Sequence, residues 1–341
     1  KVEVTLKDVN IDTSSRNKAA VSVTGSGNTT IKLDGDNALK SDTYRSGIYG
    51  SGSLTISGGT VTANGDDGGH GIYSRGSITI SGGSTVTANG RSGTISGGDG
   101  IRSDGGVTIS GGTVNATGGN GGSLGGGSGI YSNGSVTISG GTVTAKGGSG
   151  EDGYGGDGIR SSSGGVTVSD GTVTAKGGNG DSKDGYGGDG IRSGGVVTIS
   201  GNTVNAAGGY GGKVGGYGIC SFDRVAISGG TVEAAGGNGS TGGGSGIYSS
   251  VIDLSGSLEL TAKAGSPTGK ALLQNGSELD LDTIKDKLGP GAKVTVTDAN
   301  GETKQVSIPR PVEPEEPVIP GESSSSSDGG SSAPSAPASP L

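Results

Sequence analysis

The stretch Gly129-Ile-Tyr-Ser-Asn-Gly-Ser-Val-Thr-Ile-Ser-Gly-Gly-Thr-Val-Thr-Ala-Lys-Gly-Gly148 recurs along this chain with small variations. Successive copies are offset by 24, 29, 29, 29, 32, 28 and 28 residues. Their first residues are Gly47, Gly71, Gly100, Gly129, Gly158, Gly190, Gly218 and Gly246. A repeat of this length is typical of a solenoid, in which each unit buries its apolar side by stacking on the next. The sequence therefore predicts a repetitive, elongated fold.

Within one copy, apolar and polar residues alternate. Val136 and Ile138 flank a threonine, and so do Val143 and Ala145. A period of two indicates strands with one buried face, and the glycines between them allow turns. With a further strand at Ile130, each copy gives three short strands. We predict an all-β fold, a right-handed parallel β-helix with coils of 24–32 residues that rise by about 4.8 Å each.

Four columns of apolar residues are expected to form the core, because β-branched side chains suit a pleated, buried surface. The first column is Ile48, Ile72, Ile101, Ile130, Ile159, Ile191, Ile219 and Ile247. The second is Ile56, Ile80, Ile109, Ile138, Val168, Ile199 and Ile227. The third is Val61, Val86, Val114, Val143, Val173, Val204 and Val232. The fourth is Ala63, Ala88, Ala116, Ala145, Ala175, Ala206 and Ala234.

The composition agrees with a solenoid. Of 341 residues 81 are glycine, and only 28% are hydrophobic, too few for a globular core of this size. A net charge of −8 without a basic stripe argues against nucleic acid as a partner. There is no apolar run of 18 residues, so we expect no membrane insertion. We also expect a monomer.

The repeat divides the chain. Residues 1–46 are expected to form irregular N-terminal coils and residues 47–281 the regular β-helix. Residues 282–308 would form a C-terminal cap, with a β-hairpin signalled by the turn sequence Asp298-Ala-Asn-Gly301. The Pro/Glu/Ser-rich residues 309–341 are expected to be a disordered linker. The chain opens at Lys1 within a strand-like run, and we expect a signal peptide and earlier coils to be missing.

The residue after each isoleucine of the first column should point outward. These residues, called here the outward row, are Tyr49, Tyr73, Arg102, Tyr131, Arg160, Arg192, Cys220 and Tyr248. Tyrosine stacks on the apolar face of a sugar ring and arginine binds a carboxylate at two points. All members except the cysteine are therefore candidate ligand-binding residues. The alternative is that they stack on one another through cation–π contacts.

The position three residues earlier, called here the corner position, varies together with the outward row. Each arginine is preceded by an aspartate, in the pairs Asp99–Arg102, Asp157–Arg160 and Asp189–Arg192. The other copies have Ser46, His70, Ser128, Tyr217 and Ser245 there. This covariation predicts local Asp–Arg ion pairs, which compete with ligand binding by the arginines.

Acidic side chains in the glycine-rich loops suggest a calcium site, because Ca²⁺ prefers oxygen ligands. The candidate ligands are Asp152, Asp157, Asp181, Asp184 and Asp189. Residues 147–154 match the nine-residue calcium β-roll pattern once, but the pattern does not repeat in tandem. Calcium is thus an optional ligand, and no cofactor is required.

Two other functions are considered. Thr-Val-Thr recurs at 60–62, 85–87, 142–144 and 172–174, similar to the threonine arrays of ice-binding solenoids, but three copies replace its last threonine. No arrangement of nucleophile, base or paired acids stands out, so the sequence predicts a protein that is not an enzyme.

The segments Thr29–Leu39, Ser46–Tyr49 and Ser53–Ala63 resemble a bacterial pattern. It is that of repeat-rich surface proteins of Firmicutes described as carbohydrate-binding-domain-containing, of which the clostridial polygalacturonate-binding β-helix family is the nearest type. The resemblance covers about residues 1–308. It implies a secreted, non-catalytic module at the bacterial cell surface or wall that binds polysaccharide, including acidic glycan, with optional calcium. The alternative is a structural stalk or adhesin spacer.

Overall fold

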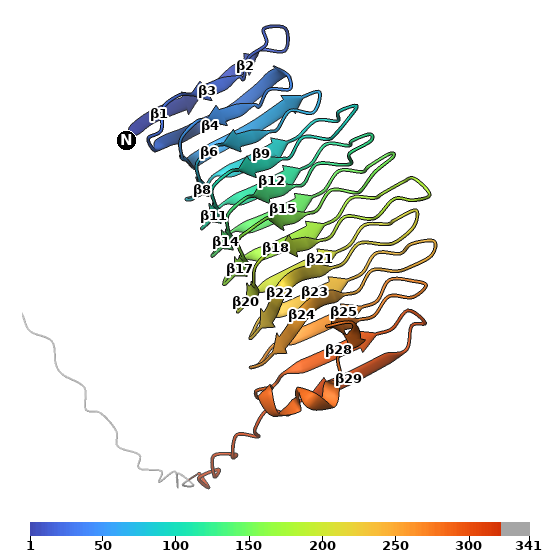
Figure 1. The fold of residues 1–341 in the computed structure, drawn as a ribbon. Coiled ribbons are helices and arrows are strands. Elements are labelled where there is room, and N and C mark those ends of the chain that lie inside the picture. Colours follow the sequence, from blue (N-terminus) through green and yellow to red (C-terminus); the bar gives the residue numbers. More distant parts are fainter. Residues whose placement is uncertain (322–341) are drawn as a thin grey trace, which may run out of the picture. The chain divides into compact units, whose positions relative to one another are not determined.

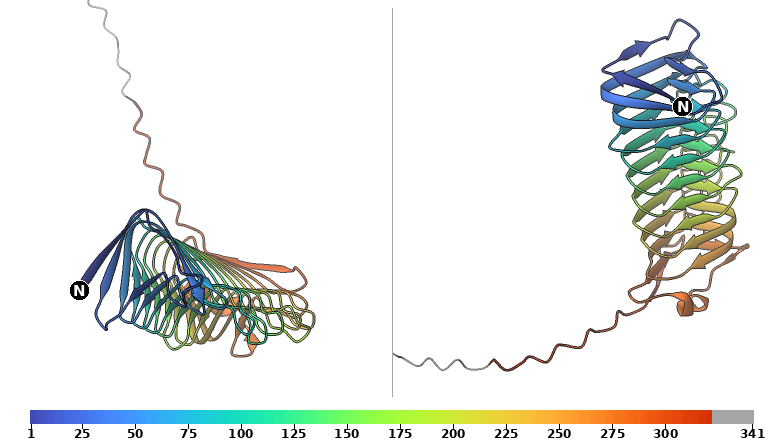
Figure 2. Two further views of the ribbon diagram at one scale, coloured as in Figure 1. Left: turned by 90° about the horizontal axis from the view of Figure 1, so that it is seen from above. Right: turned by 90° about the vertical axis from the view of Figure 1, so that its left-hand side faces the viewer.

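The computed structural model describes residues 1–321 and consists of parallel strands coiled into a β-solenoid of about ten turns (Figure 1). Twenty-nine strands belong to one continuous sheet, and two short 3-10 helices are the only helices of the described residues. Successive turns stack along one axis when viewed from the side and are progressively displaced when viewed from above (Figure 2). The predicted parallel β-helix is confirmed.

Each regular turn contributes one strand to each of three columns, so that strands lie beside their equivalents in neighbouring turns. The first column is β3 (Val21–Val23), β5 (Ile48–Gly50), β7 (Ile72–Ser74), β10 (Ile101–Ser103), β13 (Ile130–Ser132), β16 (Ile159–Ser161), β19 (Ile191–Ser193), β22 (Ile219–Ile227), β24 (Ile247–Leu254) and β26 (Leu272–Gln274). The second is β1 (Val2–Lys7), β4 (Thr29–Thr43), β6 (Leu54–Asp66), β8 (Ile78–Ile80), β11 (Val107–Ile109), β14 (Val136–Ile138), β17 (Val166–Val168) and β20 (Val197–Ile199). The third is β2 (Asn10–Asp12), β9 (Thr85–Asn89), β12 (Thr113–Thr117), β15 (Thr142–Lys146), β18 (Thr172–Lys176), β21 (Thr203–Ala207), β23 (Thr231–Ala235), β25 (Glu259–Lys263) and β28 (Lys293–Thr297).

Four strands extend across two columns, whereas the sequence predicted three separate strands in each coil. β4 and β6 pair along both the second and the third column, with register shifts in β4 between Leu33 and Asp36 and between Lys40 and Thr43. β22 and β24 join the first and second columns. The glycine that follows the first strand in the other copies is missing after Ser221 and Ser249, so the strand continues through the corner.

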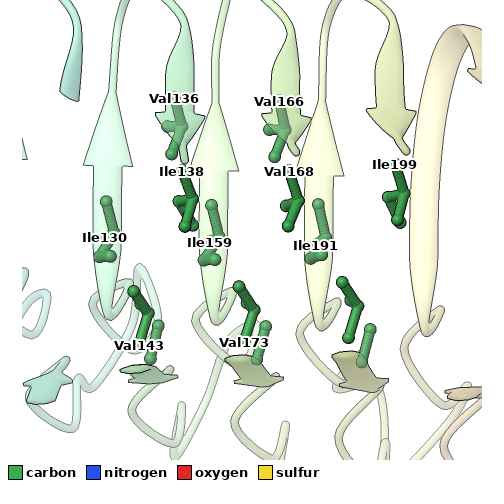
Figure 3. Close-up of a cluster of buried hydrophobic side chains, with 14 of the residues drawn as sticks. Ile130, Val136, Ile138, Val143, Ile159, Val166, Val168, Val173, Ile191 and Ile199 are labelled. Atoms are coloured by element: carbon green, nitrogen blue, oxygen red, sulfur yellow. The ribbon is translucent and has the colours of Figure 1, made fainter. Parts of the chain in front are cut away.

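The register between turns is direct, with Ile101 opposite both Ile72 and Ile130. The four predicted apolar columns are therefore stacked, and all their members are at most 2% exposed. Figure 3 shows how Ile130, Ile138 and Val143 face one another inside one turn and repeat in the next. Burying one such side chain contributes about 1.5–3 kcal/mol, so the columns are the main source of stability.

A column of buried serines lies at the corner after the first strand. Ser132 Oγ donates to the carbonyl of Gly105, in the preceding turn, at 2.8 Å. Ser161 repeats the bond to Gly134 at 2.7 Å. The same position is occupied by Ser74, Ser103, Ser193, Ser221 and Ser249, all buried. These bonds satisfy hydroxyl groups that would otherwise be costly to bury.

The glycine-rich loops extend from the third column and stack along the axis (Figure 1). A single hydrogen-bonded column of glycines runs through them, in which each N–H donates to the carbonyl of the preceding member at 2.7–2.9 Å. Its members, all buried, are Gly98, Gly119, Gly127, Gly148, Gly156, Gly178, Gly188, Gly209, Gly216, Gly237, Gly244 and Gly265. A Cβ on Gly156 would lie 1.9 Å from the Gly127 oxygen. The loops thus pack backbone against backbone, which only glycine permits.

The last turn ends in a hairpin of β28 and the antiparallel strand β29 (Thr303–Ser307). Before it, β27 (Ser277–Glu278) pairs antiparallel with β26. The 3-10 helices Leu281–Thr283 and Lys285–Lys287 lie between, and buried Ile284 and Leu288 anchor them.

Residues 1–309 form one compact unit, and Arg310 begins a second. Residues 310–321 are exposed and have neither helix nor strand. The rest of the predicted linker, 322–341, lies outside the described residues. No helix within residues 1–321 is long and apolar enough to cross a membrane.

Candidate functional site

The outward row exists as a row. Tyr73 lies opposite Tyr49 on one side and Arg102 on the other, and Arg160 lies opposite Tyr131 and Arg192. The row follows from the pleat, because the side chain after a buried isoleucine must point away from the core. All seven predicted ligand-binding residues therefore lie on one face.

The row also stacks on itself. The guanidinium carbon of Arg102 lies 4.5 Å from the ring centroid of Tyr131, and that of Arg160 lies 5.7 Å from the same ring. Because these arginines come from the turns on either side, they cover both faces of Tyr131. Tyr49 and Tyr73 contact each other with centroids 5.6 Å apart. A sugar ring therefore cannot stack on Tyr131 without displacing an arginine.

The predicted ion pairs are present. Arg102, Arg160 and Arg192 have a guanidinium nitrogen 3.1, 3.9 and 3.2 Å from a carboxylate oxygen of Asp99, Asp157 and Asp189, respectively. The three aspartates are buried, whereas the arginine side chains are about one-third to two-fifths exposed. Each pair thus turns an outward arginine into a partly neutralised donor.

The second oxygen of each carboxylate has a role that the sequence did not reveal. Asp157 Oδ1 accepts the backbone N–H of Asp189, one turn on, at 2.8 Å, and Asp189 Oδ1 accepts that of Tyr217 at 2.8 Å. Asp99 Oδ1 accepts the Ser128 N–H at 2.7 Å. The aspartates therefore bridge consecutive turns at the corner. The covariation with arginine indicated only half of this arrangement.

His70 also lies at the corner position and, like the aspartates, accepts a hydrogen bond from the next turn. Its Nδ1 atom accepts the backbone N–H of Asp99 at 2.8 Å, so this nitrogen carries no proton. Burial lowers the pKa of His70, and the nearby Asp99 carboxylate opposes that effect. The geometry makes His70 a neutral acceptor within the stack.

Burial raises the pKa of the Asp157 carboxyl. For Asp189, burial and the neighbouring Asp157 charge together raise the pKa to about 7, against the opposing effects of Arg192 and the Tyr217 N–H. Two buried carboxylates in adjacent turns disfavour each other's ionised form. The charge at this corner therefore changes near neutral pH.

A groove of about 500 Å³ runs beside these corners. Its strand side carries Arg160 and Arg192, and its loop side carries Leu124, Tyr154, Tyr186 and Val214. Between the two sides the chain has only glycines and the corner residues, among them Gly155–Gly156 and Gly187–Gly188. The groove thus has arginine on one side, aromatic rings on the other and bare backbone between.

The aromatic side of the groove was not predicted. Tyr154 is 61% exposed and lies next to Tyr186, with ring centroids 5.3 Å apart. Both tyrosines belong to the sequence Gly-Tyr-Gly-Gly-Asp-Gly-Ile-Arg, which occurs identically at 153–160 and 185–192. That exact duplication, extending beyond the core positions, was the signal that could have found them.

The other five predicted binding residues lie outside the groove. Tyr49 and Tyr73 line a second pocket at the N-terminal turns. Arg102, Tyr131 and Tyr248 line neither this pocket nor the groove. The structure therefore brings only Arg160 and Arg192 of the seven into the groove.

The five predicted metal ligands are not brought together. Asp157 and Asp189 are buried and bonded to arginine and backbone amides, whereas Asp152, Asp181 and Asp184 are on exposed loops. Within residues 1–321, no group of three or more His, Cys, Asp or Glu side chains is placed to hold a metal ion. These positions do not fit a five-residue calcium site, and calcium binding by the loop acids stays a prediction.

The threonine rows of the third column are stacked in register, with Thr113 opposite Thr85 and Thr142. The parallel row of the same face is interrupted by Asn115, Asn205 and Glu233. The regular threonine surface expected of an ice-binding face is therefore incomplete.

No curated protein and no solved structure matches the chain. The model of one family matches residues 1–242, and its description is carbohydrate-binding domain-containing protein. The match covers well over half of the chain, which accordingly belongs to this carbohydrate-binding domain-containing family.

Proposed function

We propose that the chain is a non-catalytic module that binds polysaccharide in the groove between Tyr154, Tyr186, Arg160 and Arg192. The observation that carries the proposal is the lining of the groove, which combines two tyrosine rings, two guanidinium groups and glycine backbone. Pockets that bind small ligands combine an apolar wall with a few placed polar groups. The family match supports the same class of ligand.

The chemistry of the two sides suits a sugar chain. Tyr154 offers exposed ring surface to the apolar face of a sugar, and Tyr186 supports that ring while Lys213 Nζ lies 5.8 Å from the Tyr186 centroid. The arginines donate hydrogen bonds to hydroxyl or carboxylate oxygens. The glycines let a sugar ring approach the backbone, because they carry no side chain. Successive turns repeat this arrangement along the axis at about 4.8 Å. A polymer with its own repeat is therefore a better ligand than a single small molecule.

The charge of the groove is balanced when Asp157 and Asp189 are both ionised. Arg160 and Arg192 are matched by Asp157 and Asp189, so the lining contains two cations and two acids. The groove by itself selects for shape and hydroxyl pattern more than for charge. Acidic glycan remains within its range, because each guanidinium keeps exposed donor groups.

We infer an extracellular setting, at a bacterial cell surface or wall, with the chain acting as a monomer. The resemblance to secreted surface proteins and the Pro/Glu/Ser-rich composition of residues 309–341 support this setting. A polysaccharide-binding module requires access to its polymer, and such polymers lie outside the cell. Calcium is not required for binding in the groove.

A structural spacer is the second candidate function. The self-stacking of Arg102, Tyr131 and Arg160 and the hydrogen-bonded glycine column both favour a rigid rod. A glycan array probed with the whole chain distinguishes the two functions. Binding of one or more polysaccharides supports the module, and no binding at all, with the fold intact by circular dichroism, supports the spacer.

A further inference from the structure

A second pocket of about 680 Å³ lies on the same face, at the N-terminal turns. Its aromatic residues are Tyr44, Tyr49 and Tyr73. Tyr49 and Tyr73 belong to the outward row, and Tyr44 stands four residues before Ile48, as Gly155 stands before Ile159 in the groove. The pocket therefore takes the place of the groove in the first turns, with side chains where the groove has glycine.

Three cations line this pocket, and no acidic residue is among its lining. Lys18, Arg45 and Arg75 come from three successive turns, and none of them takes part in an ion pair among residues 1–321. This distinguishes them from Arg160 and Arg192, whose charge a buried aspartate balances. The N-terminal pocket is thus the cationic part of the face.

Three acids beside the pocket are already engaged, and one of them, Asp99, pairs with Arg102 and lies 3.6 Å from the lining residue His70. Asp42 accepts the backbone N–H groups of Asn17 and Thr43, which lowers its pKa. Asp104 accepts the hydroxyl of Tyr73 at 2.9 Å and so fixes that ring at the edge of the pocket. Asp42 and Asp104 therefore bond to backbone and tyrosine groups beside the pocket, and neither forms an ion pair with its three cations.

The pocket is also preorganised. Arg45 donates through Nε and Nη2 to the side-chain oxygen of Asn17, at 3.1 Å for each bond, which orients the guanidinium. Tyr44 is 68% exposed and has φ of +57°. The left-handed conformation is rare for a bulky residue, and glycine adopts it at the equivalent Gly68. Backbone strain of this kind concentrates at functional sites.

We propose that this pocket binds the anionic groups of a glycan, carboxylate or sulfate, through Lys18, Arg45 and Arg75, with Tyr44 and Tyr49 against the sugar rings. The inference rests on the proposed function, because it names the charge class of the same polymer and locates its recognition away from the charge-balanced groove. Arginine binds such oxyanions through paired donors, and cations repeated in successive turns match a polymer with repeated charges.

Paired polymers test this proposal in calorimetric titrations of the whole chain. One pair is dextran sulfate and dextran of equal length, and the other is a uronic acid hexamer and its methyl ester. Wild type is expected to bind the charged member of at least one pair more tightly than the neutral member. Arg45→Gln/Arg75→Gln is expected to weaken binding of that charged member by about tenfold or more, with unchanged binding of the neutral member.

The matched control is Arg91→Gln, which removes an exposed arginine outside both sites and is expected to leave all affinities unchanged. Lys18→Gln, another exposed position, replaces the double variant if the latter melts below wild type. Sulfate-only or carboxylate-only preference identifies the anion and supports the proposal. Equal binding of charged and neutral members, or a preference that survives the arginine changes, overturns the inference and leaves the groove proposal standing. Absence of binding to all four polymers overturns the inference, whereas the groove proposal is decided by the glycan array.

Discussion

The carboxylate of Asp189 lies 3.2 Å from the guanidinium of Arg192 while its other oxygen holds the backbone of the following turn. One buried side chain therefore sets the position of a groove residue and joins two turns of the solenoid. Because Asp157 repeats this arrangement one turn earlier, the corner is a small network in which stability and the binding face are connected.

Substitution of Asp189 should lower the free energy of unfolding by an amount that depends on which of its bonds are lost. Asp189→Ala loses both the ion pair and the acceptor for the Tyr217 N–H, and we expect a loss of about 2 kcal/mol at pH 8. Asp189→Asn keeps an acceptor oxygen at that position and should lose less. Chemical denaturation of the two variants and wild type measures the order, and equal stability of the alanine variant and wild type would contradict the bridging role.

The raised pKa of Asp189 predicts how stability depends on pH. The pKa of about 7 means that the native state holds this proton up to about pH 7, whereas the unfolded chain releases it near the ordinary aspartate pKa of 3.8. Between these values the native state binds more protons, so the free energy of unfolding falls as pH rises and levels off above pH 7. We expect wild type to be more stable at pH 5 than at pH 8, by on the order of 2 kcal/mol.

Asp189→Asn removes this titration and provides the control. Its stability should change less between pH 5 and pH 8 than that of wild type, with the remaining slope coming from Asp157, whose pKa burial also raises. Parallel pH profiles of the two proteins would show that Asp189 does not titrate in this range.

The glycine column makes a direct prediction. Gly156→Ala places a methyl group 1.9 Å from the Gly127 oxygen, and the loss of stability should reach about 3 kcal/mol or more, because a backbone contact cannot yield as a side chain does. Gly83→Ala is the matched control, since its added methyl meets nothing within 4 Å and its φ is not positive. Thermal melts should separate the two variants clearly, and similar melting temperatures would argue against close backbone packing in the loops.

Cys220 should report on the integrity of the stack. It replaces tyrosine or arginine in the outward row, yet it is fully buried, and burial strongly raises the pKa of its thiol. The thiolate is the reactive form, so a thiol reagent should modify the native protein very slowly and the unfolded protein quickly. Rapid modification at neutral pH without denaturant would mean that the cover over Cys220 opens readily.

The sequence predicted the parts of this structure that repeat strictly. The columns of Ile130, Val143 and Ala145 follow from a period of two inside a longer repeat, because only one register buries every copy. The Asp–Arg pairs followed from covariation within the chain. The hydrogen bond from the Tyr217 backbone N–H to the Asp189 carboxylate could not be predicted, because a residue of almost any type can supply a backbone donor.

The groove was harder to predict for a related reason. Loop residues such as Tyr154 and Tyr186 lie outside the buried columns, so periodicity does not single them out. The packing of the glycine column was also hard to predict, because the glycine-rich loops have the composition of flexible linkers. Their close contacts form only when the loops of successive turns are stacked. Which members of the outward row line a groove depends on how far each loop extends beside them, and that is a property of the assembled turns.

The central claim is that Tyr154 and Tyr186 bind glycan together with Arg160 and Arg192. The most direct test is the affinity of the best array ligand for wild type, Tyr154→Ala/Tyr186→Ala and Tyr210→Ala, measured by calorimetry. Tyr210 is an exposed loop tyrosine outside the groove lining and serves as the matched control. The account predicts at least about tenfold weaker binding by the double variant and wild-type affinity for Tyr210→Ala. Undiminished binding by a folded double variant would contradict it.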